Sequence, residues 1–250
     1  WLPTLGAALF AIADWDEQTL EWATDHNPLF GNIEDAKQWS DDLAVAASLN
    51  WLVTGVAAPS GKEHFWRNKA RGLGGQALTL AATRSITDGM KSLTDRERPD
   101  RPDSNNSFPS LHTSGASSAA TLASRNIEQL DLSDRSKSAW KFGSYSLAAL
   151  TGWARIEGNR HYPSDVLFGY ALGHFIAALV NDAFIMPERG NLHFRAEQAI
   201  LHARVQIGAA CHDLGARAIF LEEFCSLFHC CGALVFKFGK VHILPNEGVS

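Results

Sequence analysis

Three polar segments of the sequence contain residues that could perform chemistry. The last of them carries residue types suited to nucleophilic attack. In residues 154–165 (ARIEGNRHYPSD), Arg155 precedes His161 by six positions and Asp165 follows it by four. A carboxylate beside an imidazole fixes the tautomer of the ring, and it stabilises the cation that develops when the other ring nitrogen attacks an electrophile. An ordinary loop with an aspartate that caps the next helix explains the same residues, so both interpretations stay open at this point.

A second segment, residues 108–114 (FPSLHTS), combines a helix start with a hydroxyl and an imidazole. Pro109 stands where a first-turn proline would stand, and the free N–H groups of a first helical turn form a natural anion site. Ser110 adds a hydroxyl donor, and His112 would stand close to a bound phosphate, where it could protonate a leaving oxygen. A capping or surface histidine is the plainer interpretation of this segment alone.

Residues 91–99 (KSLTDRERP) supply cations at a predicted helix end. Lys91 and Arg98 lie seven positions apart, which is nearly two helical turns, so both side chains can share one face. A solvated helix end, with Asp95 and Glu97 as partners, explains the same run of charges without a function.

Taken in order along the chain, the three segments resemble the type 2 phosphatidic acid phosphatase superfamily. The order is Lys-x6-Arg-Pro, then Pro-Ser-x-His, then Arg-x5-His-x3-Asp, within a resemblance that spans residues 70–185. This superfamily includes bacterial non-specific acid phosphatases, lipid phosphatases and vanadium-dependent haloperoxidases. Three spaced motifs in one order form a specific signal, although each motif alone is common.

The resemblance implies a phosphate-binding role for five of these residues. Lys91, Arg98 and Arg155 would form a clamp around the phosphate. Ser110 and nearby backbone amides, including that of Leu111, would complete it. Arginine suits this role because its planar fork makes bidentate contacts with phosphate oxygens.

The resemblance also implies the catalytic residues. His161 would be the nucleophile that forms a phosphohistidine, with Asp165 orienting its ring. His112 would protonate the leaving alcohol and then act as a base for the attacking water. Fixed cations stabilise the charge on the equatorial oxygens of a phosphoryl group in transfer. This design implies no metal ion and no cofactor.

One position departs from the family pattern. Leu111 stands between the serine and the histidine of the second motif, where the family usually has glycine. Glycine lets a backbone approach an anion closely, whereas leucine keeps the N–H but adds bulk beside the pocket. Leucine also occurs here in a branch of the superfamily that includes lipid phosphotransferases. The substrate class, and hydrolysis as against transfer, therefore stay open.

The elements that must position these residues are helices. The expected fold class is all-α, a single helical bundle in which the three motifs converge at one end. Residues 100–108 are predicted to be a polar loop, and no alternating strand pattern appears before residue 190. Apolar periodicity, prolines and polar breaks predict helices over residues 36–58, 72–93, 110–125, 138–156 and 163–185.

The character of the sequence changes after Pro187. We predict a helical phosphatase domain over residues 1–187 and a C-terminal extension over residues 188–250. In the extension, residues 191–220 could be helical and residues 233–244 are strand-like in composition. All four cysteines lie in this extension, where they could form disulfides in an exported protein, remain buried thiols or, with unfavourable spacing, bind zinc.

Composition narrows the expected partners. The net charge of -5 argues against a broad nucleic-acid-binding surface, although a local cluster of Arg and Lys can still hold phosphate. The longest stretches without charged residues, 43–60 and 166–181, are shorter than a typical spanning helix and contain polar residues. They indicate buried helices of a soluble or peripheral protein. The eight tryptophans most simply serve packing, with a lipid-facing surface in residues 1–66 as the alternative.

The function expected from the sequence is metal-independent hydrolysis of phosphate monoesters, soluble or lipid, through a phosphohistidine. A vanadium-dependent haloperoxidase would share the oxyanion clamp, and a lipid phosphotransferase would share the motifs. A non-catalytic phosphate-binding module would not need both His112 and His161. The resemblance implies export to the periplasm, with peripheral membrane contact as a further expectation. The natural substrate and the oligomeric state stay open.

Overall fold

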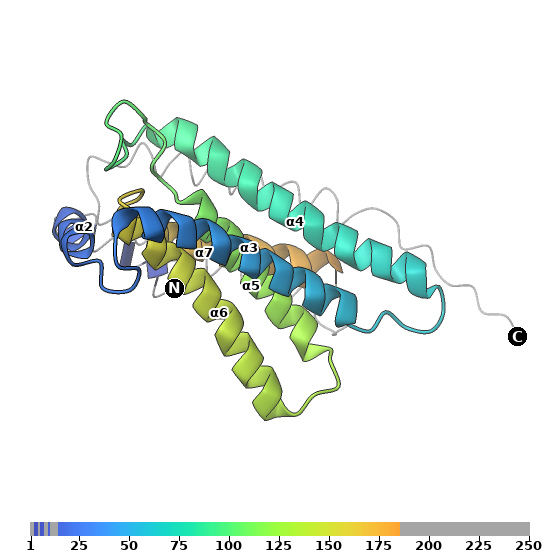
Figure 1. Cartoon of the computed structure of the whole chain (residues 1–250). Coiled ribbons are helices and arrows are strands. Elements are labelled where there is room, and N and C mark those ends of the chain that lie inside the picture. The colour runs from blue at the N-terminus through green and yellow to red at the C-terminus, as the bar shows by residue number, and fades with distance from the viewer. Residues whose placement is uncertain (1–2, 5, 8–9, 11–14, 186–250) are drawn as a thin grey trace, which may run out of the picture. The chain divides into compact units, whose positions relative to one another are not determined.

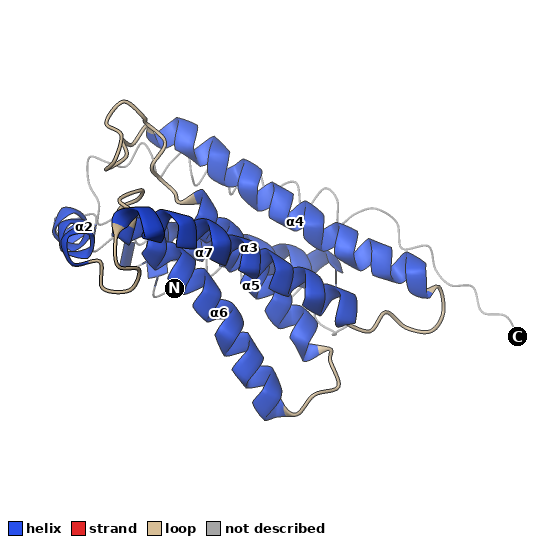
Figure 2. Cartoon of the chain, viewed as in Figure 1, coloured by secondary structure: helices blue, strands red, loops and turns tan. Residues whose placement is uncertain are grey.

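The computed structural model describes residues 3–4, 6–7, 10 and 15–185, and its regular elements are helices (Figure 1, Figure 2). Within these residues there is no strand, only an isolated bridge between Arg98 and Arg101. The predicted all-α fold is confirmed. The elements are α2 (Trp15–His26), α3 (Ile33–Ala57), α4 (Phe65–Thr94), α5 (Leu111–Glu128), α6 (Asp134–Glu157), α7 (Pro163–Val180) and a π-helical turn (Asn181–Ile185).

Local capping explains where the helix starts differ from the predicted ranges. α3 begins before residue 36 because Asn32 caps it, accepting a hydrogen bond of 2.8 Å from the N–H of Asp35. α5 begins at Leu111 with Ser110 as its N-cap, so Pro109 precedes the helix. The prediction that Pro109 lies in the first turn of this helix was wrong.

Other boundaries extend or shorten the predicted helices. α4 begins at Phe65 rather than at residue 72, and α6 begins directly after its cap Ser133. α7 ends at Val180 rather than at residue 185, where the π-helical turn replaces it. α2 has no counterpart among the predicted helices, because its sequence is mostly polar and lacks a broad apolar stripe.

The central helix is α5, which packs against α3, α4, α6 and α7. Its buried side chains are almost all alanine, serine or threonine, and small side chains let helix backbones approach closely. Hydroxyl pairs join it to α4: Thr83 Oγ1 lies 3.2 Å from Ser118 Oγ, and Thr87 Oγ1 lies 3.0 Å from Ser114 Oγ. The core of this bundle is therefore small and partly polar.

The closest approach in the bundle joins α7 to the first turns of α5. A Cβ on Gly169 would lie 2.7 Å from the carbonyl oxygen of Ser110, and one on Gly173 would lie 2.0 Å from that of Ser114. The N–H of Ser110 donates to the carbonyl of Asp165 over 3.1 Å. These two glycines therefore let the second and third sequence motifs meet.

Two further expectations bear on membrane contact and on the extension. Of the helices described, only α7 is long and apolar enough to cross a membrane, and half of it is buried within the bundle. The predicted extension over residues 188–250, with its four cysteines, lies outside the described residues. Its boundary, secondary structure, disulfides and zinc alternative stay predictions.

Replacing Gly173 by alanine should destabilise the protein, because the added Cβ meets the backbone of Ser114 and α7 must move away from α5. We expect a loss of roughly 1–3 kcal/mol in the free energy of unfolding, measured by chemical denaturation. Gly143→Ala is the matched control, since nothing lies within 4 Å of its added Cβ. Helix propensity alone should make that control stabilising by roughly 0.5–1 kcal/mol. Equal stabilities of the two variants would contradict the tight contact.

Candidate active site

The three sequence motifs come together at the end of the bundle where α4 and α6 end and where α3, α5 and α7 begin (Figure 1). Lys91 lies in the last turn of α4, and His112 lies in the first turn of α5. Arg155 lies in the last turn of α6, and Asp165 lies in the first turn of α7. Four separate helix ends thus contribute to one site.

A tight turn after α6 presents His161 to this site. Gly158 ends the helix and Asn159 adopts a left-handed conformation with φ of 55°. The chain then folds back, so that the N–H groups of Arg160 and His161 both donate to the carbonyl of Arg155, over 2.9 and 3.3 Å. The turn therefore holds the imidazole beside the end of α6 that carries Arg155.

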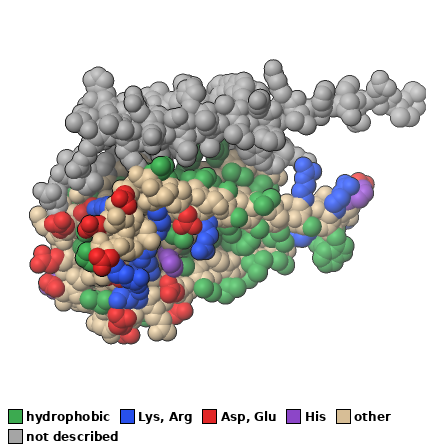
Figure 3. Space-filling view, turned by 90° about the horizontal axis from the view of Figure 1, so that it is seen from above, with side chains coloured by type: hydrophobic (Ala, Val, Ile, Leu, Met, Phe, Trp, Pro, Cys, Tyr) green, Lys and Arg blue, Asp and Glu red, His purple; other side chains and the backbone are tan. Residues whose placement is uncertain are grey.

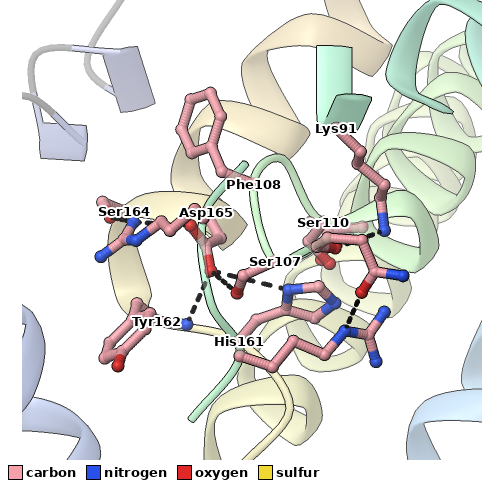
Figure 4. A network of polar contacts seen from close by, with 12 residues as sticks. Lys91, Ser107, Phe108, Ser110, His161, Tyr162, Ser164 and Asp165 are labelled. Atoms are coloured by element: carbon pink, nitrogen blue, oxygen red, sulfur yellow. Dashed lines mark hydrogen bonds and ion pairs between the residues drawn. The ribbon is translucent and has the colours of Figure 1, made fainter. Parts of the chain in front are cut away.

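His161 and Asp165 form the buried centre of the site (Figure 4). The imidazole is 1% exposed, and its Nδ1 lies 3.6 Å from Oδ2 of Asp165. Burial, followed by the charges of Arg155 and Lys91, lowers the pKa of His161 to about 3, although Asp165 opposes this. The imidazole is therefore neutral near pH 7, which is the state that a nitrogen nucleophile requires.

Asp165 is both a helix cap and the partner of His161. Its Oδ2 accepts hydrogen bonds from Ser107 Oγ at 2.5 Å and from the N–H of Tyr162, the N-cap of α7, at 3.0 Å. Burial would raise the pKa of this carboxyl, but the contact with His161 and the charge of Arg96 lower it further than burial raises it. Both sequence interpretations of Asp165 thus apply to one carboxylate.

Two of the cations share one loop residue. Lys91 Nζ donates to the carbonyl of Asn106 over 3.1 Å, and Arg98 Nε donates to the side-chain oxygen of Asn106 over 2.5 Å. Burial and the charge of Arg98 lower the pKa of Lys91 to about 8. This depression indicates that the ammonium lacks a full counter-charge where it lies.

Arg155 is the third cation and is 5% exposed. Its Nη1 donates to Ser40 Oγ over 3.0 Å, and its buried Nε has no hydrogen-bond partner within the described part of the chain. Burial and the charges of Arg160 and Arg98 lower its pKa to about 10. A phosphate oxygen would satisfy both the free donor and the excess positive charge.

His112 stands at the solvent side of the cluster. Its Nε2 lies 3.0 Å from Oδ1 of Asp41, a residue of α3, and the same oxygen lies 3.8 Å from Nη1 of Arg155. Burial and the charge of Arg155 lower the pKa of His112 to about 4, against the opposing effect of Asp41. Lys91 and Arg98 add to the depression.

The first turn of α5 is available to an anion. Ser110 is fully buried, and its hydroxyl lies 2.9 Å from Thr113 Oγ1, so no side chain caps the helix. The amides of Leu111 and His112 belong to the first turn, whose N–H groups have no partner within a helix. The N–H of Ser110 itself is already used by Asp165. Leucine at position 111 keeps its N–H in this turn, and the phosphate-binding role expected for it stays a prediction.

The surface charge agrees with these contacts. In Figure 3, Lys and Arg side chains gather in one patch with a histidine among them, and acidic side chains lie around it. Hydrophobic side chains gather on another part of the same face. A chain with a net charge of -5 thus presents a local positive field to an anion.

Several residues of this site were not predicted from the sequence. Asn106 and Ser107 lie in the loop predicted only as polar, and Ser40 and Asp41 lie in α3, a segment predicted only as a helix. Arg96 also contacts Asp165 directly, over 2.6 Å. Most of these residues have partners far away in the sequence, as Ser107 does with Asp165, 58 positions later.

Fold and site together define an all-helical protein with a buried His–Asp pair facing clustered cations. Residues 72–186 match the family model of the PAP2 superfamily. The matched residues contain all three motifs, so the resemblance to the type 2 phosphatidic acid phosphatase superfamily that these motifs predict is confirmed over this part of the chain.

Two known proteins are similar to this chain. Lipid A 1-phosphatase of Porphyromonas gingivalis is 38% identical over 104 residues, which are 41% of this chain and 22% of that protein. The chain thus spans less than a quarter of that relative. The crystal structure of a transmembrane PAP2-type phosphatidylglycerolphosphate phosphatase from Bacillus subtilis shares the fold, with a TM-score of 0.55 and 20% identity. The similarity covers 76% of this chain and 96% of that one.

Replacing Asp41 by asparagine should lower the pKa of His112 further, because the carboxylate that favours the imidazolium is removed while Arg155, Lys91 and Arg98 remain. We expect a shift of roughly one pH unit, measured by NMR titration of the assigned ring. Asp42→Asn removes the same charge from the next exposed position and is the control. An equal shift in both variants would show that the 3.0 Å contact has no specific effect.

Proposed function

We propose that this chain is a phosphatase that hydrolyses phosphorylated lipids at a membrane through a phosphohistidine intermediate. The observation that carries the proposal is the buried pair of His161 and Asp165, with Nδ1 facing the carboxylate and the charges of Arg155 and Lys91 acting on the ring. Binding alone would not require a neutral, oriented imidazole beside a second histidine, His112.

In the first half of the reaction, Nε2 of His161 attacks the phosphorus while Lys91, Arg98 and Arg155 hold the other oxygens. The bond from phosphorus to the leaving oxygen breaks, and His112 supplies the proton that this oxygen needs. The developing imidazolium keeps its Nδ1 proton, and Asp165 stabilises its charge. Charge on the equatorial oxygens is stabilised by the three fixed cations.

In the second half, water attacks the phosphorus of the phosphohistidine and gives a proton to His112, which now acts as the base. The bond between Nε2 and phosphorus breaks, and inorganic phosphate leaves. Substrate binding prepares His112 for the first half, because the phosphate charge offsets Arg155, Lys91 and Arg98, the cations that depress its pKa. The protonated acid is thus favoured when substrate is present.

A lipid substrate is supported by the names of the two similar proteins and by the outer face of α3. Both names describe enzymes that act on phosphorylated lipids. The exposed face of α3 carries a stripe of large apolar side chains at helical spacing, each 43–58% exposed, while its buried residues, apart from Leu43, are small or polar. The stripe consists of Val45, Leu49, Leu52, Val53 and Val56.

This distribution is the reverse of that in a soluble helix, where large apolar residues face the core. In a bilayer, small residues pack between helices and large apolar residues face lipid. Beyond the stripe, Phe65 and Trp66 are exposed beside the cations Lys62 and Arg67. Aromatic and basic residues gather at the headgroup level of membranes. We therefore propose that α3 contacts lipid, and that the protein is exported with its site facing the periplasm.

The decisive test is turnover with trapping of the intermediate. Wild-type protein is assayed for phosphate release from phosphatidic acid, an isoprenyl diphosphate, nucleotides and p-nitrophenyl phosphate, with chelator present, and is quenched for acid-labile phosphoenzyme. We expect release from the lipids and a label that His161→Ala abolishes, with turnover falling at least 1,000-fold. His174→Ala, whose ring contacts Thr121 in α5 outside the clamp, is the control and should retain both.

Other outcomes assign other functions. Release from soluble esters alone would contradict the lipid proposal, and transfer of phosphate to an added lipid alcohol would assign a phosphotransferase. Halide oxidation by peroxide with vanadate, without phosphate release, would assign a haloperoxidase. Undiminished label in His161→Ala would remove His161 from the mechanism.

The lipid-facing role of α3 has its own test. The double substitution Leu49→Glu and Val53→Glu should weaken retention of the protein in the membrane fraction after a carbonate wash. The reason is that a charge in the hydrocarbon region costs about 2.5–3.5 kcal/mol per residue. Gln38→Glu adds a charge to an exposed position in the polar part of the same helix and should leave retention unchanged. Equal retention of both variants would place the stripe outside the lipid.

A further inference from the structure

Arg96 lies outside the three motifs yet contacts the carboxylate behind His161. It follows the end of α4, and its guanidinium bridges two buried carboxylates. Nη1 lies 2.6 Å from Oδ1 of Asp165, and Nη2 lies 2.9 Å from Oδ2 of Asp16 in α2. Asp16 and Asp165 are 5% and 0% exposed. No contact in the described structure joins Arg96 to the phosphate clamp itself.

Both ends of the bridge are fixed by further contacts. The guanidinium lies 4.3 Å from the centre of the Tyr162 ring, and Nη1 also donates to Ser164 Oγ over 2.7 Å. Asp16 accepts a hydrogen bond of 2.8 Å from the N–H of Ser164, and another from its hydroxyl. α2, the end of α4 and the start of α7 are therefore joined around one cation.

The contacts of Asp165 divide between its two oxygens. Oδ1 faces Arg96, whereas Oδ2 receives Ser107 and the N–H of Tyr162 and faces His161 at 3.6 Å. Only one side of the carboxylate is thus directed at the nucleophile. The cation on the other side offsets part of the negative charge that would otherwise act on the imidazole.

We propose that Arg96 is a positioning residue that controls His161 through Asp165. It holds the carboxylate in the orientation that faces Nδ1, and its charge limits how strongly Asp165 favours the imidazolium. Its effect on the imidazole requires only the geometry above, whereas its effect on turnover rests on the proposed phosphatase function. Asp16 serves as the anchor of this bridge.

Removing the cation has a defined sign. Among the charged groups that act on the pKa of His161, Asp165 raises it, whereas Arg155 and Lys91 lower it. Without Arg96, Ser107 and the N–H of Tyr162 still hold Oδ2 of Asp165 toward the ring. The full charge of the carboxylate then acts on the imidazole, so the imidazolium becomes easier to form. The pKa of His161 therefore rises, and the acidic limb of kcat/KM, which requires the neutral ring, moves to higher pH. A role in folding alone would not move that limb.

Lysine at this position separates charge from bridging. An ammonium keeps the positive charge but cannot span two carboxylates with a planar fork. In Arg96→Lys the acidic limb should stay near its wild-type position while kcat falls, roughly 10- to 100-fold, as for residues that orient functional histidines from behind. In Arg96→Met both the limb and kcat should change.

The experiment follows the ring of His161 by NMR in full-length protein, with the His161→Gln spectrum for assignment, alongside pH profiles of phosphatidic acid hydrolysis. We expect the pKa of His161 to rise by roughly one unit or more in Arg96→Met and to change little in Arg96→Lys. Arg125→Met is the matched control, since it breaks an exposed arginine–aspartate pair with Asp182 outside the site. It should leave the pKa and the profile unchanged.

The outcomes separate this inference from the proposed function. An unchanged pKa of His161 in Arg96→Met, or a fall in kcat with an unmoved limb, would overturn the positioning role. If Arg96→Met shifts the pKa of His161 but the wild-type protein hydrolyses no phosphate ester, the inference is supported and the proposed phosphatase function is contradicted. Should Arg96→Met fail to fold, the lysine variant decides, because wild-type kcat there would overturn the bridging role.

Discussion

Several cations lie close together in this protein where water is largely excluded, and this arrangement opposes folding until an anion binds. Burial and mutual repulsion lower the pKa values of both Lys91 and Arg155. The chain offsets the repulsion between the cations only in part. Lys91 and Arg98 donate to the two oxygens of Asn106, and Arg155 donates to the hydroxyl of Ser40 and lies 3.8 Å from Oδ1 of Asp41. On the proposed function, the remaining positive field is what an incoming phosphate would meet. The helices must be packed firmly enough to hold such a cluster in place.

That firmness comes from close backbone contacts rather than from large side chains. Gly169 and Gly173 let α7 lie directly against α5, and alanines from three helices form much of the core. Because the helix backbones touch, the helix ends cannot shift independently, and the motifs that they carry keep their relative positions. Because small residues fill the interior, large apolar residues lie on the outside of the bundle, as on the exposed face of α3.

Local signals explain what could be predicted from the sequence. The motif residues, most helices and the all-α fold follow from spacing, prolines and apolar periodicity. The capping function of Asp165 and the catalytic role expected for it could both be predicted from residues 161–165. The contacts of Asp16 were not, because its partner Ser164 lies 148 positions away. The apolar run in α3 was also visible, but its exposed face could not be inferred, since small residues formed the core in its place.

Asp41 gives the site an internal counter-ion. One of its oxygens lies near both His112 and Arg155, while most of its carboxylate remains exposed to solvent. An arriving phosphate must compete with this tethered carboxylate for the same cations, and so must the phosphate that a turnover would leave behind. Asp41 therefore weakens the grip on substrate and product alike. Such an enzyme would bind phosphate groups less tightly and release them faster. Free orthophosphate in its surroundings would therefore inhibit it less.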